Sequence, residues 1–203
     1  MNHNSEPTTN AGPVRIILGA SKTQQEGWVS TEKSDLNLLS IEDWERLCKR
    51  GTIDSLLAEM VWVYFDEQEA KLAAKHCFDF LKPGGSLRVC VSDAYFPDQN
   101  YVNYVVPGGT DPGSHLYKSC SAMTYISMRA LFEDVGFEVD LLEYFDEQGR
   151  FHFRNWDPKD GMVRRTRRYD KRNSRDCIGY TALLIDARKP ILENVRVKFP
   201  SNV

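Results

Sequence analysis

Three side chains in this sequence could remove a proton from a bound substrate or donate one to it: Asp93, His115 and His152. Asp93 directly follows a predicted strand, 86–92, and parallel α/β sheets bind their ligands at the carboxyl ends of strands. His115 lies in a long polar loop, and His152 lies between two phenylalanines on another predicted strand. One interpretation is acid–base catalysis. The alternative is structural, with Asp93 capping a turn and His152 packed against its neighbours.

A second chemical feature is a run of cationic residues that includes Arg164, Arg165 and Arg168. Arginine binds carboxylate and phosphate groups through two parallel hydrogen bonds, so these three residues are candidates for binding an anionic substrate. The structural alternative is a lattice of ion pairs with the neighbouring acids Asp157, Asp160, Asp170 and Asp176. A nucleic-acid backbone is disfavoured, because the chain has a net charge of −3 and no recognition motif.

Other kinds of site are not expected. The four histidines are not paired at metal-ligand spacing, and the five cysteines contain no Cys-x-x-Cys pair, so we expect neither a metal site nor a disulfide framework. His76 falls on a helix face that we expect to be exposed, and it is assigned no role. No apolar run is long enough to span a membrane, and residues 1–12 lack the apolar core of a signal peptide. We expect a cytoplasmic protein with a small-molecule substrate.

Among the elements that would position these side chains, a helix predicted over 66–81 has the clearest sequence pattern. Asp66 and Glu69 have the spacing of a capping box, and apolar residues then recur every three or four positions. The Lys-Pro-Gly-Gly turn at 82–85 ends the helix, and alternating apolar residues predict the strand 86–92.

The same patterns predict the rest of the sheet. Helices are expected at 40–51 and 124–135, a long loop at 94–123, and further strands at 14–18, 27–32, 53–59, 137–145 and 180–187. The last two strands have no helix between them. We therefore expect an α/β fold with a mostly parallel sheet and an antiparallel C-terminal edge hairpin. It would form one domain, 13–190, with an Arg-rich insert at about 146–178 and tails at 1–12 and 191–203.

Four stretches together resemble small predicted methyltransferases of the class I S-adenosylmethionine (SAM)-dependent superfamily: Gly27–Glu32, Leu81–Val89, Asp146–Phe153 and Trp156–Arg165. The resemblance covers about 14–190 and implies a Rossmann-like methyltransferase sheet. The segment between the first two strands is too short for a helical crossover. Members of this subgroup also shorten that crossover.

The resemblance also implies where SAM would bind. Its methionine part would lie near Gly19, Ala20 and Ser21, and its adenine near Asn37, Glu59 and Met60. Its ribose would lie at Glu32, because an acid at the tip of the second strand accepts hydrogen bonds from ribose hydroxyls in nucleotide-binding sheets. A solvated strand end is the alternative for Glu32.

The sequence departs from the subgroup at three places. The first loop, Leu18–Lys22, has fewer glycines, Met60 and Val63-Tyr64 replace His and Glu-His, and Ser92 replaces the proline of Val-Pro-Asp. The expected function is SAM-dependent methyl transfer to a small metabolite, for which the arginines favour an anion. The alternatives are a non-catalytic module that binds the cofactor or a partner, and an enzyme that uses the cleft for another reaction.

Overall fold

The computed structural model describes residues 12–112, 120 and 122–191. The predicted tails fall almost wholly outside these residues, and His115 also lies outside them.

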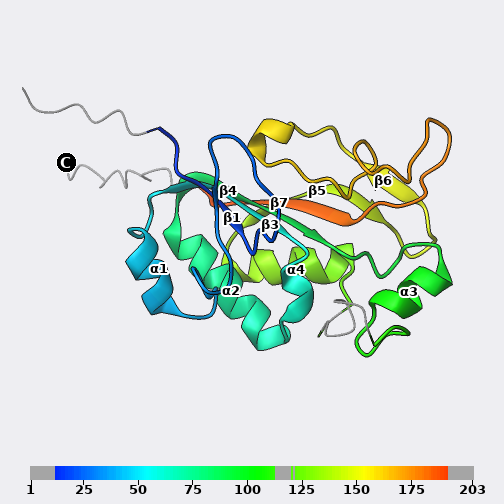
Figure 1. Ribbon diagram of the computed structural model, residues 1–203, viewed down its shortest axis with the longest axis horizontal. Helices are drawn as coiled ribbons and strands as arrows, with labels where there is room; N and C mark the ends of the chain where they lie inside the picture. Colours follow the sequence, from blue (N-terminus) through cyan, green and yellow to red (C-terminus); the bar gives the residue numbers. More distant parts are fainter. Residues whose placement is uncertain (1–11, 113–119, 121, 192–203) are drawn as a thin grey trace, which may run out of the picture.

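A seven-stranded sheet in the order β2-β1-β3-β4-β7-β5-β6 forms the centre of the fold (Figure 1). Neighbouring strands from β2 to β4 are parallel, and β7 is antiparallel to both β4 and β5. Strand β5 therefore runs in the same direction as the first four. The strands are β1 (Arg15–Leu18), β2 (Val29–Ser30), β3 (Ile53–Glu59), β4 (Leu81–Val91), β5 (Glu138–Phe145), β6 (Phe151–Phe153) and β7 (Leu183–Arg188).

This architecture confirms the predicted Rossmann-like sheet, mostly parallel with antiparallel C-terminal strands. One detail differs from the expected edge hairpin. Strand β7 lies between β4 and β5, so the edge strand on this side of the sheet is β6, which pairs with β5 from within the Arg-rich insert.

The helices are α1 (Ile41–Leu47), α2 (Glu67–Phe80), α3 (Gln99–Val105) and α4 (Tyr125–Val135), with short 3-10 helices η1 (Trp62–Tyr64) and η3 (Pro158–Asp160). Figure 1 shows α1, α2 and α4 on one face of the sheet, while the Arg-rich insert crosses the opposite face. Helix α3 was not expected, because its residues lie in the predicted loop 94–123. Among the described residues, no helix is long and apolar enough to cross a membrane.

The ends of the helices follow from local sequence. Asp66 accepts a hydrogen bond from the Glu69 N–H, and the Glu69 carboxylate accepts one from the Asp66 N–H, as a capping box requires. Gly136 ends α4 with φ of 110°, in the left-handed region that favours glycine. After α2 the chain turns extended at once, so β4 begins at Leu81 and not at the predicted residue 86.

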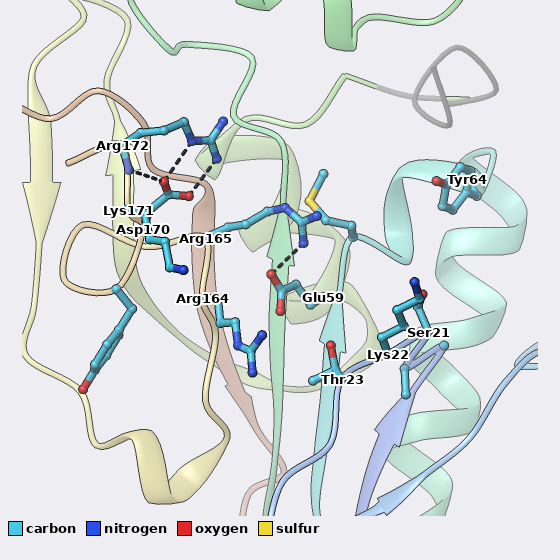
Figure 2. Close-up of a pocket in the computed structure, with 14 residues that line it drawn as sticks. Ser21, Lys22, Thr23, Glu59, Tyr64, Arg164, Arg165, Asp170, Lys171 and Arg172 are labelled. Carbon is cyan, nitrogen blue, oxygen red and sulfur yellow. Dashed lines mark hydrogen bonds and ion pairs between the residues drawn. The ribbon is translucent and has the colours of Figure 1, made fainter. Parts of the chain in front are cut away.

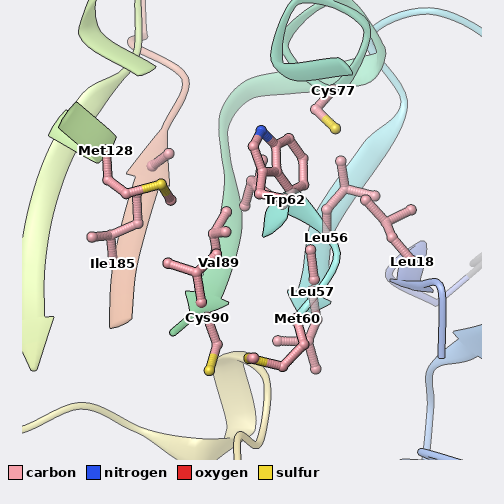
Figure 3. Close-up of a cluster of buried hydrophobic side chains, with 14 of the residues drawn as sticks. Leu18, Leu56, Leu57, Met60, Trp62, Cys77, Val89, Cys90, Met128 and Ile185 are labelled. Carbon is pink, nitrogen blue, oxygen red and sulfur yellow. The ribbon is translucent and has the colours of Figure 1, made fainter. Parts of the chain in front are cut away.

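The hydrophobic core lies between the sheet and the helices. Figure 3 shows Trp62 beside Cys77 of α2 and near Leu56 and Val89 of the sheet, and all four are completely buried. The expected exposure of His76 is wrong. Its side chain is buried, and its Nδ1 atom lies 2.8 Å from the Leu38 carbonyl oxygen, because the segment before α1 covers this face of α2.

Candidate functional site

A cavity of about 810 Å³ opens at the carboxyl ends of β1 and β3 (Figure 2). Its volume lies in the range of small-molecule sites. Residues from three parts of the chain line it: the loop after β1, the segment after β3, and the Arg-rich insert. They are Gly19, Ala20, Ser21, Lys22, Thr23, Glu59, Met60, Tyr64, Arg164, Arg165, Tyr169, Asp170, Lys171 and Arg172.

The loop after β1 makes a sharp bend. Gly19 has φ of 57°, and a Cβ atom at this position would lie 3.0 Å from the Cγ2 atom of Val61. Only glycine combines this backbone conformation with such a close approach. The Ala20 N–H donates to the Thr31 carbonyl at 2.8 Å, which holds the bend against the end of β2.

The segment after β3 also has unusual backbone geometry. Met60 has φ of 61° and Ser21 has φ of 50°; these are the only residues other than glycine with positive φ in the described part of the chain. Both line the cavity. The Met60 N–H donates to the Cys90 carbonyl at 2.7 Å, so β4 holds the residue in place. Backbone strain of this kind concentrates at functional sites.

Arg88 of β4 fixes the first part of the Arg-rich insert. Its buried guanidinium donates to both oxygens of Asp186, at 2.7 and 2.8 Å. It also donates to the carbonyls of Asp157 and Gly161, at 3.0 and 2.6 Å. The Trp156 ring centroid lies 4.7 Å from the guanidinium carbon. A buried charge with a full set of partners resists displacement, because moving it would leave that charge unpaired.

Glu143 of β5 fixes the part of the insert that carries the arginines. Its carboxylate is buried and accepts three hydrogen bonds. The donors are the Arg167 backbone N–H at 2.7 Å, the Thr181 hydroxyl at 2.6 Å and the Trp156 indole N–H at 3.0 Å. The cationic segment 164–172 therefore has a defined position over the sheet.

The cavity is strongly cationic. Two of its lining residues are acids, and each is paired: Glu59 with Arg165 at 2.8 Å, and Asp170 with Arg172 at 2.7 Å. The other three cationic residues, Lys22, Arg164 and Lys171, form no ion pair with any residue that the structure describes. The predicted ion-pair lattice is thus present at Asp170 but does not include Arg164.

Seven of the residues predicted from the sequence meet at this cavity: Gly19, Ala20, Ser21, Glu59, Met60, Arg164 and Arg165. Three others lie outside its lining. Glu32 is exposed, although the neighbouring Thr31 bonds to Ala20. The Asn37 side chain accepts from the Leu39 N–H in the turn before α1, and the exposed Arg168 lies over the Tyr169 ring.

Asp93 is buried two residues after the end of β4, outside the cavity lining. Its carboxylate accepts from the backbone N–H groups of Tyr95, at 2.9 Å, and Phe145, at 2.8 Å. Burial raises the pKa of this carboxyl to about 6, although the two hydrogen bonds act in the opposite direction. The carboxylate thus ties the end of β4 to the end of β5.

His152 lies on β6, also outside the cavity lining. Its Nε2 atom is 2.8 Å from an Asp146 oxygen, and its ring stacks on Tyr144 with centroids 4.9 Å apart. Hydrogen bonds from His152 and Arg150 hold the pKa of Asp146 well below its usual range despite its burial. The catalytic roles of Asp93, His115 and His152 stay predictions.

Several lining residues were not singled out from the sequence. Lys22 directly follows the predicted cofactor-binding residues Gly19, Ala20 and Ser21, so the sequence could have identified it as a further lining residue. Tyr169, Lys171 and Arg172 lie in an irregular segment without periodicity, which gave no indication of which side chains face the cavity.

Three solved structures show how this fold compares with known proteins. A SAM-dependent methyltransferase from Archaeoglobus fulgidus superimposes with a TM-score of 0.51 at 10% sequence identity, over 88% of this chain and 87% of that one. SAM-dependent methyltransferases from Methanosarcina mazei and Thermotoga maritima give TM-scores of 0.48 and 0.47 at 14% and 15% identity. They cover 84% and 86% of this chain, and 71% and 72% of their own.

No protein-family model matches the sequence, and comparison with curated proteins finds no match. At such low identity the likeness to the Archaeoglobus fulgidus enzyme concerns the fold alone. The chain has the Rossmann-like fold of SAM-dependent methyltransferases.

Proposed function

We propose that this chain transfers the methyl group of SAM to a small anionic acceptor inside the cavity. The observation that carries the proposal is the place of the cavity in the fold, at the carboxyl ends of the adjacent parallel strands β1 and β3. Open α/β sheets bind ligands at this edge. The fold shared with a SAM-dependent methyltransferase supports the same assignment.

The residues present fit SAM. Gly19 gives the loop after β1 its bend where this loop lines the cavity. Glu59 offers a carboxylate oxygen for the ribose hydroxyls, and Met60 offers an apolar contact for the adenine. Glu32, exposed beside this loop, stays a further candidate for the ribose.

SAM supplies an electrophilic methyl group on a positively charged sulfur. Transfer is an in-line displacement, so the main task of the protein is to align the acceptor and exclude competing nucleophiles. The insert supplies this alignment in the proposal, since Arg164, Lys171 and Arg172 lie across the cavity from Ser21 and Lys22 (Figure 2). Arg172 holds Asp170 on the acceptor side and lowers the pKa of its carboxyl, so this carboxylate stays ionised. In the proposal it accepts a hydrogen bond from the acceptor and orients it.

A transfer assay tests the proposal. The chain is incubated with methyl-labelled SAM and an extract of small metabolites, and the products are separated by anion exchange. We expect label in an anionic product, and loss of that label when Asp170 is changed to Asn while the exposed Asp176→Asn retains it. Cofactor binding without transfer to any fraction would favour the non-catalytic alternative and contradict the proposed reaction.

A further inference from the structure

The charge of the cavity exceeds what SAM can neutralise. Its lining contains five cationic residues and two acids, in a chain whose net charge is −3. Both acids are already paired with arginines. Among the described residues, Lys22, Arg164 and Lys171 are therefore the lining cations that form no ion pair. SAM has a single carboxylate, together with a positively charged sulfur and an ammonium group, so it cannot compensate three cations.

Lys22, Arg164 and Lys171 are exposed, so they are open to a ligand from solvent, and an anion bound among them would relieve the repulsion between these cations. The three come from opposite sides, Lys22 from the loop after β1 and the other two from the insert (Figure 2). Glu143 and Arg88 hold the insert in place, so Arg164 and Lys171 are not part of a freely moving loop. Their gathering is thus a built feature of the fold.

From this arrangement we propose that the methyl acceptor is a phosphorylated small molecule, whose phosphate is bound by Lys22, Arg164 and Lys171. This inference rests on the proposed function for the identity of the reaction, but the phosphate site itself does not depend on it. A phosphate presents oxygens in several directions and carries up to two charges, whereas a carboxylate carries one charge and accepts within a plane. Cationic groups that face one cavity from two walls suit the phosphate.

Hydroxyl groups at the same cavity add donors for phosphate oxygens. Ser21 and Thr23 flank Lys22 on one wall. A recess with these walls favours a small phosphate ester over a polymer, because a nucleic-acid backbone binds along an open basic stripe.

Calorimetry with inorganic pyrophosphate and with succinate, at matched ionic strength, tests the assignment. We expect pyrophosphate to bind about tenfold or more tightly than succinate. Its affinity should fall about tenfold in Arg164→Gln and in Lys171→Gln, which remove charge-assisted hydrogen bonds, and should stay unchanged in Arg175→Gln, an exposed control in the same insert. Thermal unfolding of each variant checks that the fold is retained.

Equal binding of succinate, or equal loss in Arg175→Gln, would overturn the phosphate site. So would tighter binding of a single-stranded oligonucleotide than of pyrophosphate. Titration with S-adenosylhomocysteine (SAH) in the same samples separates the two proposals. If SAH binds and pyrophosphate does not, only the phosphate site is contradicted. If pyrophosphate binds and SAH does not, only the methyl-transfer proposal is contradicted.

Discussion

Arg165 donates a hydrogen bond to Glu59 at 2.8 Å, joining the Arg-rich insert to the end of β3 across 106 positions of sequence. The Glu59 side chain is 9% exposed and that of Arg165 is 42% exposed. The carboxylate therefore depends on this partner more than the guanidinium does. The pair orients two of the side chains that line the cavity.

Breaking this pair from the arginine side should destabilise the fold. Arg165→Ala leaves the Glu59 carboxylate largely buried without its guanidinium, and we expect a loss of about 1–3 kcal/mol in the free energy of unfolding. The double variant Arg165→Ala/Glu59→Gln removes the unpaired charge and should recover part of that loss. Urea denaturation measures both values. A double variant less stable than the single one would contradict this account.

Glu143 should contribute more to stability than any exposed acid. Glu143→Gln keeps one acceptor oxygen but turns an N–H group toward donors. We therefore expect the free energy of unfolding to fall by about 2–4 kcal/mol. Glu138→Gln, an exposed change on the same strand, should alter stability by less than about 0.5 kcal/mol. Urea denaturation distinguishes the two. Similar values for both variants would show that Glu143 does not hold the insert.

Asp93 should make stability fall as the pH rises. Its folded pKa of about 6 lies above the ordinary value of 3.8, so between these two pH values the folded state retains a proton that the unfolded state has lost. The contribution of Asp93 to the free energy of unfolding is greatest below pH 3.8. It falls by about 3 kcal/mol in all as the pH rises through about 6. Asp93→Asn lacks this titration. The stability of wild type relative to Asp93→Asn should decline from pH 4 to pH 7, and parallel pH profiles would contradict the assignment.

Much of the fold could be predicted because it is determined by local sequence. The Asp66 and Glu69 capping box predicted the start of α2, and alternating apolar residues predicted the second half of β4. The burial of His76 could not be predicted in this way. It depends on a contact with Leu38, 38 positions earlier, which no local periodicity contains.

The candidate site, too, could be predicted only in part. Gly19 and Glu59 could be placed because Gly19 follows one predicted parallel strand and Glu59 ends another, and the carboxyl ends of such strands meet at one edge of the sheet. In the insert, Arg164 lines the cavity and Arg168 does not. That difference is set by the distant anchors Glu143 and Arg88, so no local sequence pattern distinguishes the two arginines.

The central claim is that the bend at Gly19 forms a binding site for SAM. Titration of SAH into wild type, Gly19→Ala and Gly27→Ala tests it most directly. Gly19 and Gly27 both have positive φ, at 57° and 76°, so both changes strain the backbone. Only at Gly19 does the added Cβ meet another atom, since nothing lies within 4 Å of that position at Gly27.

We predict that SAH binds wild type and Gly27→Ala with similar micromolar affinity, and that Gly19→Ala binds it about tenfold more weakly or not at all while remaining folded. Absence of binding to wild type at millimolar SAH, or equal binding by all three proteins, would contradict the claim.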